Sequence, residues 1–306
     1  MSEISQRKPV AWAEINWAGR RVSIEYRWLG PQGRAAPLMV FLHEGLGSVS
    51  MWRDFPSQLC QTLGCRGLVY SRPGYGQSTP RPAQERWSPD FMHRQALEVL
   101  PTFLDAVGVS QPVWLFGHSD GGSIALIYAA RHSSPKALGS YGNAPSASLV
   151  GAQPSGQSIV PRAPPVAGTI VMAPHILVED QSIRSIEQAR QAYINTDLPD
   201  RLARHHADPD SAFWGWNDIW LNPAFRSWSL EEEMVSIACP LLAAQGLDDE
   251  YGTLEQIRGI RHRVPQAELL ELADCGHWPH RDQPARLITQ VHAFFRRHAT
   301  AKDETP

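Results

Sequence analysis

The sequence predicts a protein of the α/β class, in which helices flank both faces of a mostly parallel central sheet. Short apolar runs are typical of strands that are buried on both faces, and they occupy residues 37–43, 67–71, 112–117, 168–174, 240–246 and 267–273. Segments with a helical spacing of apolar residues alternate with these runs, at 51–63, 89–107, 120–132, 253–263 and 284–298. This alternation favours a parallel sheet, because each parallel connection has to cross over the sheet.

The start of the chain departs from this order. Residues 10–29 contain two alternating runs, rich in β-branched and aromatic residues and joined at Gly19-Arg20. Alternation of apolar and polar residues predicts strands with one buried face. We therefore expect an antiparallel hairpin before the parallel sheet begins.

The composition of the 306-residue chain is that of a folded globular protein, with 42% hydrophobic and 19% charged residues. The formal net charge is -3, and acidic and basic residues are scattered along the sequence. Since no basic face is available to neutralise phosphates, we expect no nucleic-acid partner. We expect a small-molecule substrate and a monomer or homodimer.

The N-terminal sequence MSEISQRKPV is polar, unlike the apolar centre of a secretion signal. No run of about 20 apolar residues predicts a membrane span. The cysteines at positions 60, 65, 239 and 275 have neither C-x-x-C spacing nor histidines at zinc-finger spacing, which indicates reduced, buried thiols. We expect a cytoplasmic protein that does not associate with membranes.

Two segments interrupt the alternation of strands and helices. Residues 133–165 are rich in Ser, Pro, Gly and Ala and show no period, so we expect a flexible insertion. Residues 175–236 contain helical patterns and a dense group of tryptophans, which predicts an inserted helical cap. The core is then expected to comprise 1–174 and 237–306.

Tryptophans of the predicted cap are candidates for substrate binding, because ligand cavities are lined mainly by apolar and aromatic side chains. We take Trp214, Trp216 and Trp220 as candidate substrate-binding residues, with Trp228 as a further member of the group. The alternative is that they form only the core of the cap itself.

The sequence Gly117-His118-Ser119-Asp120-Gly121 stands between an apolar strand and a helical segment. A serine at a sharp turn from strand to helix presents its hydroxyl above the sheet. Glycines flank it because side chains there would collide with neighbouring backbone. Ser119 is therefore the candidate nucleophile. It needs a base, and the base needs an acceptor, because an alkoxide does not form unaided at neutral pH.

Both partners are available later in the chain, each after a predicted strand. The strand at 240–246 leads into the acidic residues at 248–250, and the strand at 267–273 leads to His277 and His280. The candidate nucleophile, acid and base therefore occur in the order serine, acid, histidine.

Four motifs share this order with a known group of enzymes. They are FLHEGLGS (41–48), SRPGYGQS (71–78), GHSDGG (117–122) and the pair GLDDEYG (246–252) with CGHWPH (275–280). With these motifs the chain resembles the α/β-hydrolase superfamily over nearly its whole length outside the predicted insertion. The resemblance implies the α/β-hydrolase fold, with Asp249 as the acid and His277 as the base.

The resemblance also implies an oxyanion hole of two backbone N–H groups, which face the developing charge without reorganising. One belongs to Asp120, directly after the nucleophile. The other lies in the loop after the first core strand, where relatives read His-Gly and this chain reads His43-Glu44-Gly45. Gly45 is the first choice as donor and Glu44 the second. The Glu44 carboxylate either turns outward to bond surrounding backbone or orients water or a cationic substrate group.

For the other polar residues of these motifs we expect substrate-binding or structural roles. We take His43 and His118 as candidate substrate-binding residues, although packing and capping at the helix start would also explain His118. Arg72 and Tyr75, in the Pro-Gly motif, are expected to be structural.

Histidine pairs in the sequence do not predict a metal site. Neither His205-His206 nor the pair His277 and His280 has a third ligand at a diagnostic spacing. We expect the first pair to be solvated on the cap, and the second to be the base with a structural neighbour.

These residues together predict a serine hydrolase that works without a cofactor. The resemblance implies carboxylic-ester hydrolysis through an acyl-enzyme. The tryptophans of the predicted cap indicate an uncharged, small to medium hydrophobic or aromatic ester. One alternative is a hydrolase of carbon-carbon bonds in ring-fission products, or a lyase, with the same triad; a basic pocket, with Arg184, Arg190 and Arg226 as candidates, would favour it. The second alternative is a non-catalytic ligand receptor.

Overall fold

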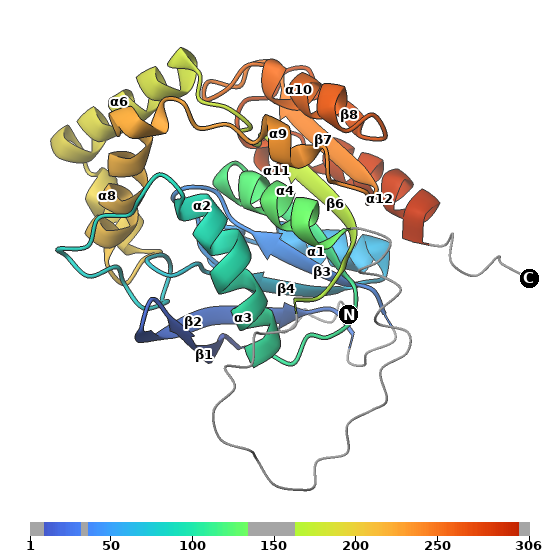
Figure 1. The fold of residues 1–306 in the computed structure, drawn as a ribbon, viewed down its shortest axis with the longest axis horizontal. Helices are drawn as coiled ribbons and strands as arrows, with labels where there is room; N and C mark the ends of the chain where they lie inside the picture. Colours follow the sequence, from blue (N-terminus) through green and yellow to red (C-terminus); the bar gives the residue numbers. More distant parts are fainter. Residues whose placement is uncertain (1–8, 32–35, 134–162, 300–306) are drawn as a thin grey trace, which may run out of the picture.

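The computed structural model describes residues 9–31, 36–133 and 163–299, and it confirms the predicted class. Within these residues eight strands form one sheet, in the order β1-β2-β4-β3-β5-β6-β7-β8 (Figure 1). β2 pairs antiparallel with both β1 and β4, and the other neighbouring pairs are parallel. The strands are β1 (Ala11–Trp17), β2 (Arg20–Leu29), β3 (Leu38–Leu42), β4 (Arg66–Tyr70), β5 (Val113–His118), β6 (Val166–Met172), β7 (Leu241–Gly246) and β8 (Glu268–Leu272).

β1 and β2 form the predicted hairpin, with the turn one residue earlier than expected. Ala18 and Gly19 connect the two strands, and their φ angles are positive, 50° and 73°. Positive φ at both central residues matches the twist of a two-residue hairpin. Glycine adopts this conformation readily, which explains its place in the turn.

Helices cover both faces of the sheet, because successive side chains of a strand point to opposite faces. On one face Met39 and Phe41 share a core with Leu59 of α1 and Phe294 of α12. On the other face Val40 shares a core with residues of α3, α4 and α10. These helices are α1 (Phe55–Leu63), α3 (Leu100–Ala106), α4 (Asp120–His132), α10 (Glu255–Arg263) and α12 (Pro284–Ala299).

The single helix expected at 89–107 consists of three parts. α2 (Phe91–Arg94) and α3 flank a π-helical turn, η1 (Gln95–Val99). Pro101 lacks the N–H that would bond the carbonyl four residues earlier, and its ring would clash with that carbonyl. A wider turn directly before the proline relieves both problems.

The segment predicted as a cap has its helices α6 and α8 at one end of the sheet, whereas α9 packs beside α4 and α10. Figure 1 shows α6 and α8 apart from the helices that cover the faces of the sheet. An isolated antiparallel bridge joins Leu177 to Ser229 and brings the two ends of the segment together. The segment contains α6 (Asp180–Asn195), α7 (Leu198–Ala203), α8 (Pro209–Trp220), the 3-10 turn η2 (Pro223–Phe225) and α9 (Glu231–Met234).

The domain boundaries stay a prediction, with a core of 1–174 and 237–306 and a cap of 175–236. The insertion expected at 133–165 lies almost entirely outside the described residues. In the part of the chain that the structure describes, no helix is long and apolar enough to cross a bilayer.

Candidate active site

Ser119 stands at the sharp turn between β5 and α4. Its φ of 52° and ψ of -122° lie in a sparsely populated region, which costs a non-glycine residue about 1–3 kcal/mol. A Cβ on Gly117 would collide with the backbone of Gly121, and a Cβ on Gly121 would collide with the carbonyl of Leu42. The turn therefore requires both glycines, for the reason given by the sequence pattern.

The side chains of Ser119, His277 and Asp249 form one hydrogen-bonded chain. The hydroxyl Oγ of Ser119 lies 3.0 Å from Nε2 of His277, and Nδ1 of His277 lies 2.8 Å from Oδ1 of Asp249. The three residues follow β5, β8 and β7, which belong to the parallel part of the sheet. Carboxyl ends of parallel strands lie at the same edge, so residues 158 positions apart in the chain are brought together.

The loop after β7 separates the roles of its neighbouring carboxylates. Asp249 accepts the backbone N–H of Tyr251 at 2.8 Å in addition to its contact with His277. Glu250 accepts instead the backbone N–H of His277, at 3.2 Å, and Asp248 is exposed. Asp249 is therefore the carboxylate of this loop that meets the imidazole ring.

Helix α6 holds this loop from the other side of the site. Three side chains at the start of the helix donate hydrogen bonds to the backbone carbonyls of residues 249–251, at 2.7, 2.6 and 2.5 Å. The donors are Gln181, Ser182 and Ser185. The position of the Asp249 backbone thus depends on the first two turns of α6.

Burial and the Asp249 carboxylate act in opposite directions on His277. Burial lowers the pKa of the imidazole, but the charge and hydrogen bond of Asp249 outweigh it, so the pKa of His277 is raised above its ordinary 6.5. Burial raises the pKa of Asp249, and the charge and hydrogen bond of His277 bring it below its ordinary value. The ionised carboxylate thus stabilises the imidazolium that would form when His277 accepts a proton.

Three donors hold the carbonyl group of Glu44. They are the N–H of Gly47 at 3.1 Å, Nδ1 of His43 at 2.7 Å and Nη2 of Arg72 at 2.9 Å. Nε2 of His43 accepts the backbone N–H of Arg72 at 3.0 Å, so Nδ1 carries the proton and donates it. In a trans peptide the carbonyl and the following N–H point in opposite directions. The three bonds therefore fix the direction of the Gly45 N–H.

Arg72 also connects this loop to the residue after the nucleophile. Its guanidinium is fully buried, lies 4.5 Å from the centre of the Tyr75 ring, and stands 3.8 Å from Oδ2 of Asp120. Oδ1 of Asp120 accepts the indole N–H of Trp220 at 3.1 Å. Burial raises the pKa of Asp120 to about 6, although the charge of Arg72 opposes the rise. Arg72 thus contacts both segments that carry a candidate oxyanion donor.

The Glu44 side chain does not turn outward, so the first of its two expected orientations is wrong. Glu44 is 9% exposed, and its carboxylate lies 3.6 Å from Nδ1 of His118 and 4.0 Å from Nη2 of Arg281. Burial alone would raise the pKa of Glu44, but the facing imidazole of His118 holds it well below its ordinary value. Basic side chains therefore face this carboxylate inside the protein.

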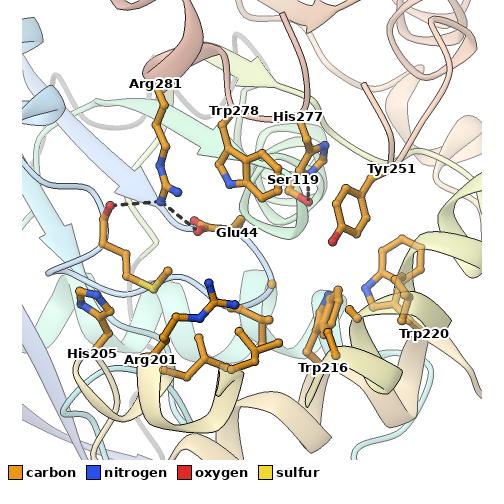
Figure 2. A pocket seen from close by; sticks show the side chains of 18 of the residues that line it. Glu44, Ser119, Arg201, His205, Trp216, Trp220, Tyr251, His277, Trp278 and Arg281 are labelled. Carbon is orange, nitrogen blue, oxygen red and sulfur yellow. Dashed lines mark hydrogen bonds and ion pairs between the residues drawn. The ribbon is translucent and has the colours of Figure 1, made fainter. Parts of the chain in front are cut away.

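Ser119 opens into a cavity of about 520 Å³ that also contacts helices α6, α7 and α8 (Figure 2). The indole of Trp216 lies so close to Gly45 that a Cβ on Gly45 would collide with it. Glycine at this position therefore lets the cap segment approach the 43–47 loop. The predicted site residues that line the cavity are Glu44, Gly45, Ser119, Trp216, Trp220 and His277.

Comparison with protein families agrees with this geometry. A model described as "Alpha/beta hydrolase family" matches residues 39–290, which is most of the chain. The protein belongs to this family.

Two curated relatives of the hydrolase cover most of its length. A cis-3-alkyl-4-alkyloxetan-2-one decarboxylase of Xanthomonas campestris is 25% identical over 90% of this chain and 93% of its own. A mouse sn-1-specific diacylglycerol lipase is 22% identical over 85% of this chain and 81% of its own. Among solved structures, a thermophilic esterase of Thermogutta terrifontis superposes with a TM-score of 0.64 at 16% identity, over 95% of this chain and 99% of its own. The structural likeness shows a shared fold.

Three candidate substrate-binding residues of the hydrolase lie outside the cavity lining. His43 is buried, with both ring nitrogens bonded as described above. Nε2 of His118 donates to the carbonyl of His277 at 2.7 Å. Trp214 lines a separate groove beside Arg190, whose guanidinium is 5.8 Å from its ring. Trp214 and Trp216 differ because residues two apart on a helix point in different directions.

Several lining residues of the hydrolase were not predicted from the sequence. They are His175, Arg201, Tyr251, Trp278 and Arg281. His175 comes shortly after β6, and its place beyond the carboxyl end of a parallel strand was a signal that could have identified it. Burial lowers the pKa of His175 to about 3 and raises that of Tyr251 to about 12, so both side chains are neutral near pH 7.

The basic residues of the cavity differ from those proposed on the sequence. Arg184, Arg190 and Arg226 do not line it. Arg226 is exposed and pairs with Asp180 at 2.7 Å. Helical spacing places arginines on a solvated face but does not identify the few that face a cavity.

The expectation of a solvated His205-His206 pair is wrong for His206, which is 2% exposed. Nδ1 of His206 accepts the N–H of Gly76, and Nε2 donates to the carbonyl of Leu46, both at 2.9 Å. His205 lines the cavity. Over the ranges that the structure describes, no group of three His, Cys, Asp or Glu residues is arranged to hold a metal ion.

Proposed function

We propose that the protein is a serine hydrolase that cleaves carboxylic esters through an acyl-enzyme. The observation that carries the proposal is the hydrogen-bonded chain from Ser119 through His277 to Asp249, which opens into a cavity beside the 43–47 loop. The names of relatives support ester chemistry, since they include a diacylglycerol lipase and a protein phosphatase methylesterase.

The proposed reaction assigns a residue to each step. Nε2 of His277 takes the proton of the Ser119 hydroxyl, and Oγ attacks the ester carbonyl. The N–H groups of Asp120 and Gly45 receive the oxyanion, and His277 protonates the alcohol that leaves. A water molecule deprotonated by His277 then attacks the acyl group and releases the acid, which restores Ser119.

The size and lining of the cavity support the proposal of a small to medium hydrophobic or aromatic substrate. Its volume of about 520 Å³ is within the range typical of small-molecule sites. Trp216, Trp220 and Ile186 supply aromatic and aliphatic surface near Ser119.

The first experiment combines a fluorophosphonate probe with p-nitrophenyl esters of increasing acyl length. Wild type should be labelled at Ser119 and should hydrolyse esters, whereas Ser119→Ala and His277→Ala should lose both properties. Failure of wild type to react with the probe would overturn the serine-hydrolase proposal and favour a ligand receptor.

A second candidate function is cleavage of a carbon-carbon bond, by hydrolysis or in a lyase reaction. Two arginines line the cavity, as expected for a substrate carboxylate, and one relative is named as a decarboxylase of a cyclic ester. This candidate predicts that Ser119 reacts with the probe while the p-nitrophenyl esters are not hydrolysed. Products from an oxetan-2-one separate the two further: ester hydrolysis gives a hydroxy acid, whereas decarboxylation gives an alkene.

A further inference from the structure

The cavity has two chemically different ends, with Ser119 between them. Figure 2 shows Tyr251 and Trp220 on one side of Ser119, and Arg201 and Arg281 on the other. The first end offers aromatic surface, and the second offers two guanidinium groups. A substrate that fills both ends therefore needs an apolar part and an anionic part.

Both arginines keep donors for a ligand. In the described ranges, Arg281 contacts Glu44 at 4.0 Å and the carbonyl of Met51 at 3.4 Å with one nitrogen, Nη2. Arg201 contacts Asp197, one turn earlier, with Nε at 3.4 Å. These contacts are longer than charge-assisted hydrogen bonds, which measure about 2.7–2.9 Å. Since a guanidinium has five N–H donors, each arginine can form a bidentate pair with a carboxylate.

The surroundings of His205 indicate the sign of the electrostatic field at the arginine end of the cavity. Burial lowers the pKa of His205, and the charges of three arginines lower it further. These arginines are Arg281, Arg53 and Arg204. This end of the cavity thus carries several positive charges although the whole chain has a net charge of -3, and such a local field concentrates anions at a site.

We propose that the substrate is an ester that also carries a carboxylate, which Arg201 and Arg281 bind while Ser119 attacks the ester carbonyl. The proposal rests on the ester hydrolysis proposed above and adds the chemical class of the substrate. The apolar part of the substrate contacts Trp216 and Trp220 at the other end of the cavity.

Matched ester pairs test this preference on either side of the ester bond. The p-nitrophenyl monoester of glutarate is compared with p-nitrophenyl valerate, and 4-butyryloxybenzoate is compared with 4-butyryloxybenzamide. We expect the anionic member of at least one pair to have the higher kcat/KM. Added salt should reduce this preference, because mobile ions screen exposed charges.

The arginines are then replaced one at a time. Arg201→Gln and Arg281→Gln should each reduce the preference for the anionic ester by about fivefold, with little change for the neutral ester. Arg190→Gln is the matched control, because Arg190 is an arginine of the neighbouring helix α6 that lies beside a separate groove. Thermal unfolding of each variant checks that the fold is kept.

The outcomes distinguish the two proposals. Hydrolysis of neutral esters without an anionic preference in either pair overturns the inference and leaves the ester hydrolase in place. A preference that neither arginine variant reduces also overturns it. Absence of both probe labelling and ester hydrolysis overturns the proposed function, and the inference with it.

Discussion

Arg72 is the residue that contacts both segments of the proposed oxyanion hole. Its Nη2 donates to the carbonyl of Glu44, and the guanidinium faces Asp120 at 3.8 Å. Lysine keeps the charge but presents a single ammonium, which does not reproduce the planar fork. For Arg72→Lys we expect kcat to fall by about 10- to 100-fold with little change in KM, because the Gly45 N–H acts mainly in the transition state.

A transition-state mimic separates this role from general packing. A boronic acid that bonds to Ser119 should bind Arg72→Lys more weakly, in proportion to the loss in kcat. A loss of thermal stability with unchanged kcat would show instead that Arg72 only packs.

The raised pKa of His277 determines the pH dependence of the reaction. His277 must be neutral to take the proton from Ser119, so kcat/KM should rise with pH through an apparent pKa above 6.5. Asp249→Asn removes the carboxylate that raises this pKa. We expect the rise of kcat/KM with pH, the acid limb of the profile, to move to lower pH. We also expect kcat to fall by about 10⁴-fold.

Asp120 is the control for this measurement, because its pKa of about 6 places its titration near the same range. If the acid limb does not move in Asp249→Asn but moves in Asp120→Asn, the limb reports Asp120 and the role given to His277 is contradicted.

At the scale of residues, the sequence identified site residues correctly where they belong to a motif. It was less successful where a residue was chosen only for the chemistry of its side chain. Ser119 had its flanking glycines, and His277 and Asp249 had strand-ending positions, so the structure joins all three. Trp214 and His118 were selected by residue type and proximity alone. Their side chains point elsewhere in the folded chain, and neither lines the cavity.

At the scale of elements, His206 is the side chain between α7 and α8 that joins the cap segment to two loops of the core. His206→Ala leaves the N–H of Gly76 and the carbonyl of Leu46 without this partner. An unsatisfied buried polar group costs about 1–3 kcal/mol. We expect the free energy of unfolding in urea to fall by about 2–4 kcal/mol.

His205→Ala is the matched control for that experiment. The His205 side chain bonds the hydroxyl of Ser50 in an exposed contact, so its loss should change the free energy of unfolding by less than about 1 kcal/mol. Equal losses in the two variants would contradict the role given to His206.

Elements were predicted well where apolar periodicity alone determines them. β5 and the helix after the nucleophile agree with the expected ranges to within one residue, because both are almost fully buried. β8 was expected to be buried on both faces, but it is only partly buried because it lies at the edge of the sheet. The π-helical turn before Pro101 was not predicted, since the apolar spacing on either side of it still fits one helix. The hairpin turn differed by one residue because Ala18 adopts a positive φ that its sequence does not require.

At the scale of the whole molecule, the sequence predicted a mostly parallel sheet but not the order of its strands. β3 lies between β4 and β5, although β4 follows β3 in the chain. The inner strands β3 to β7 are mostly apolar, so periodicity does not distinguish one neighbour from another. The cavity was likewise not predictable, because residues of α6, α7 and α8 meet Ser119 only in the folded chain.

The bridge between Leu177 and Ser229 has a consequence for recombination between relatives. A segment that leaves and re-enters the core at one point can be exchanged without changing the path of the remaining chain. However, Gln181, Ser182 and Ser185 bond the loop that carries Asp249. A chimaera that keeps α6 up to Ser185 and replaces the chain from there to Ser229 would therefore exchange the cap residues that line the cavity while keeping the donors that hold the Asp249 loop.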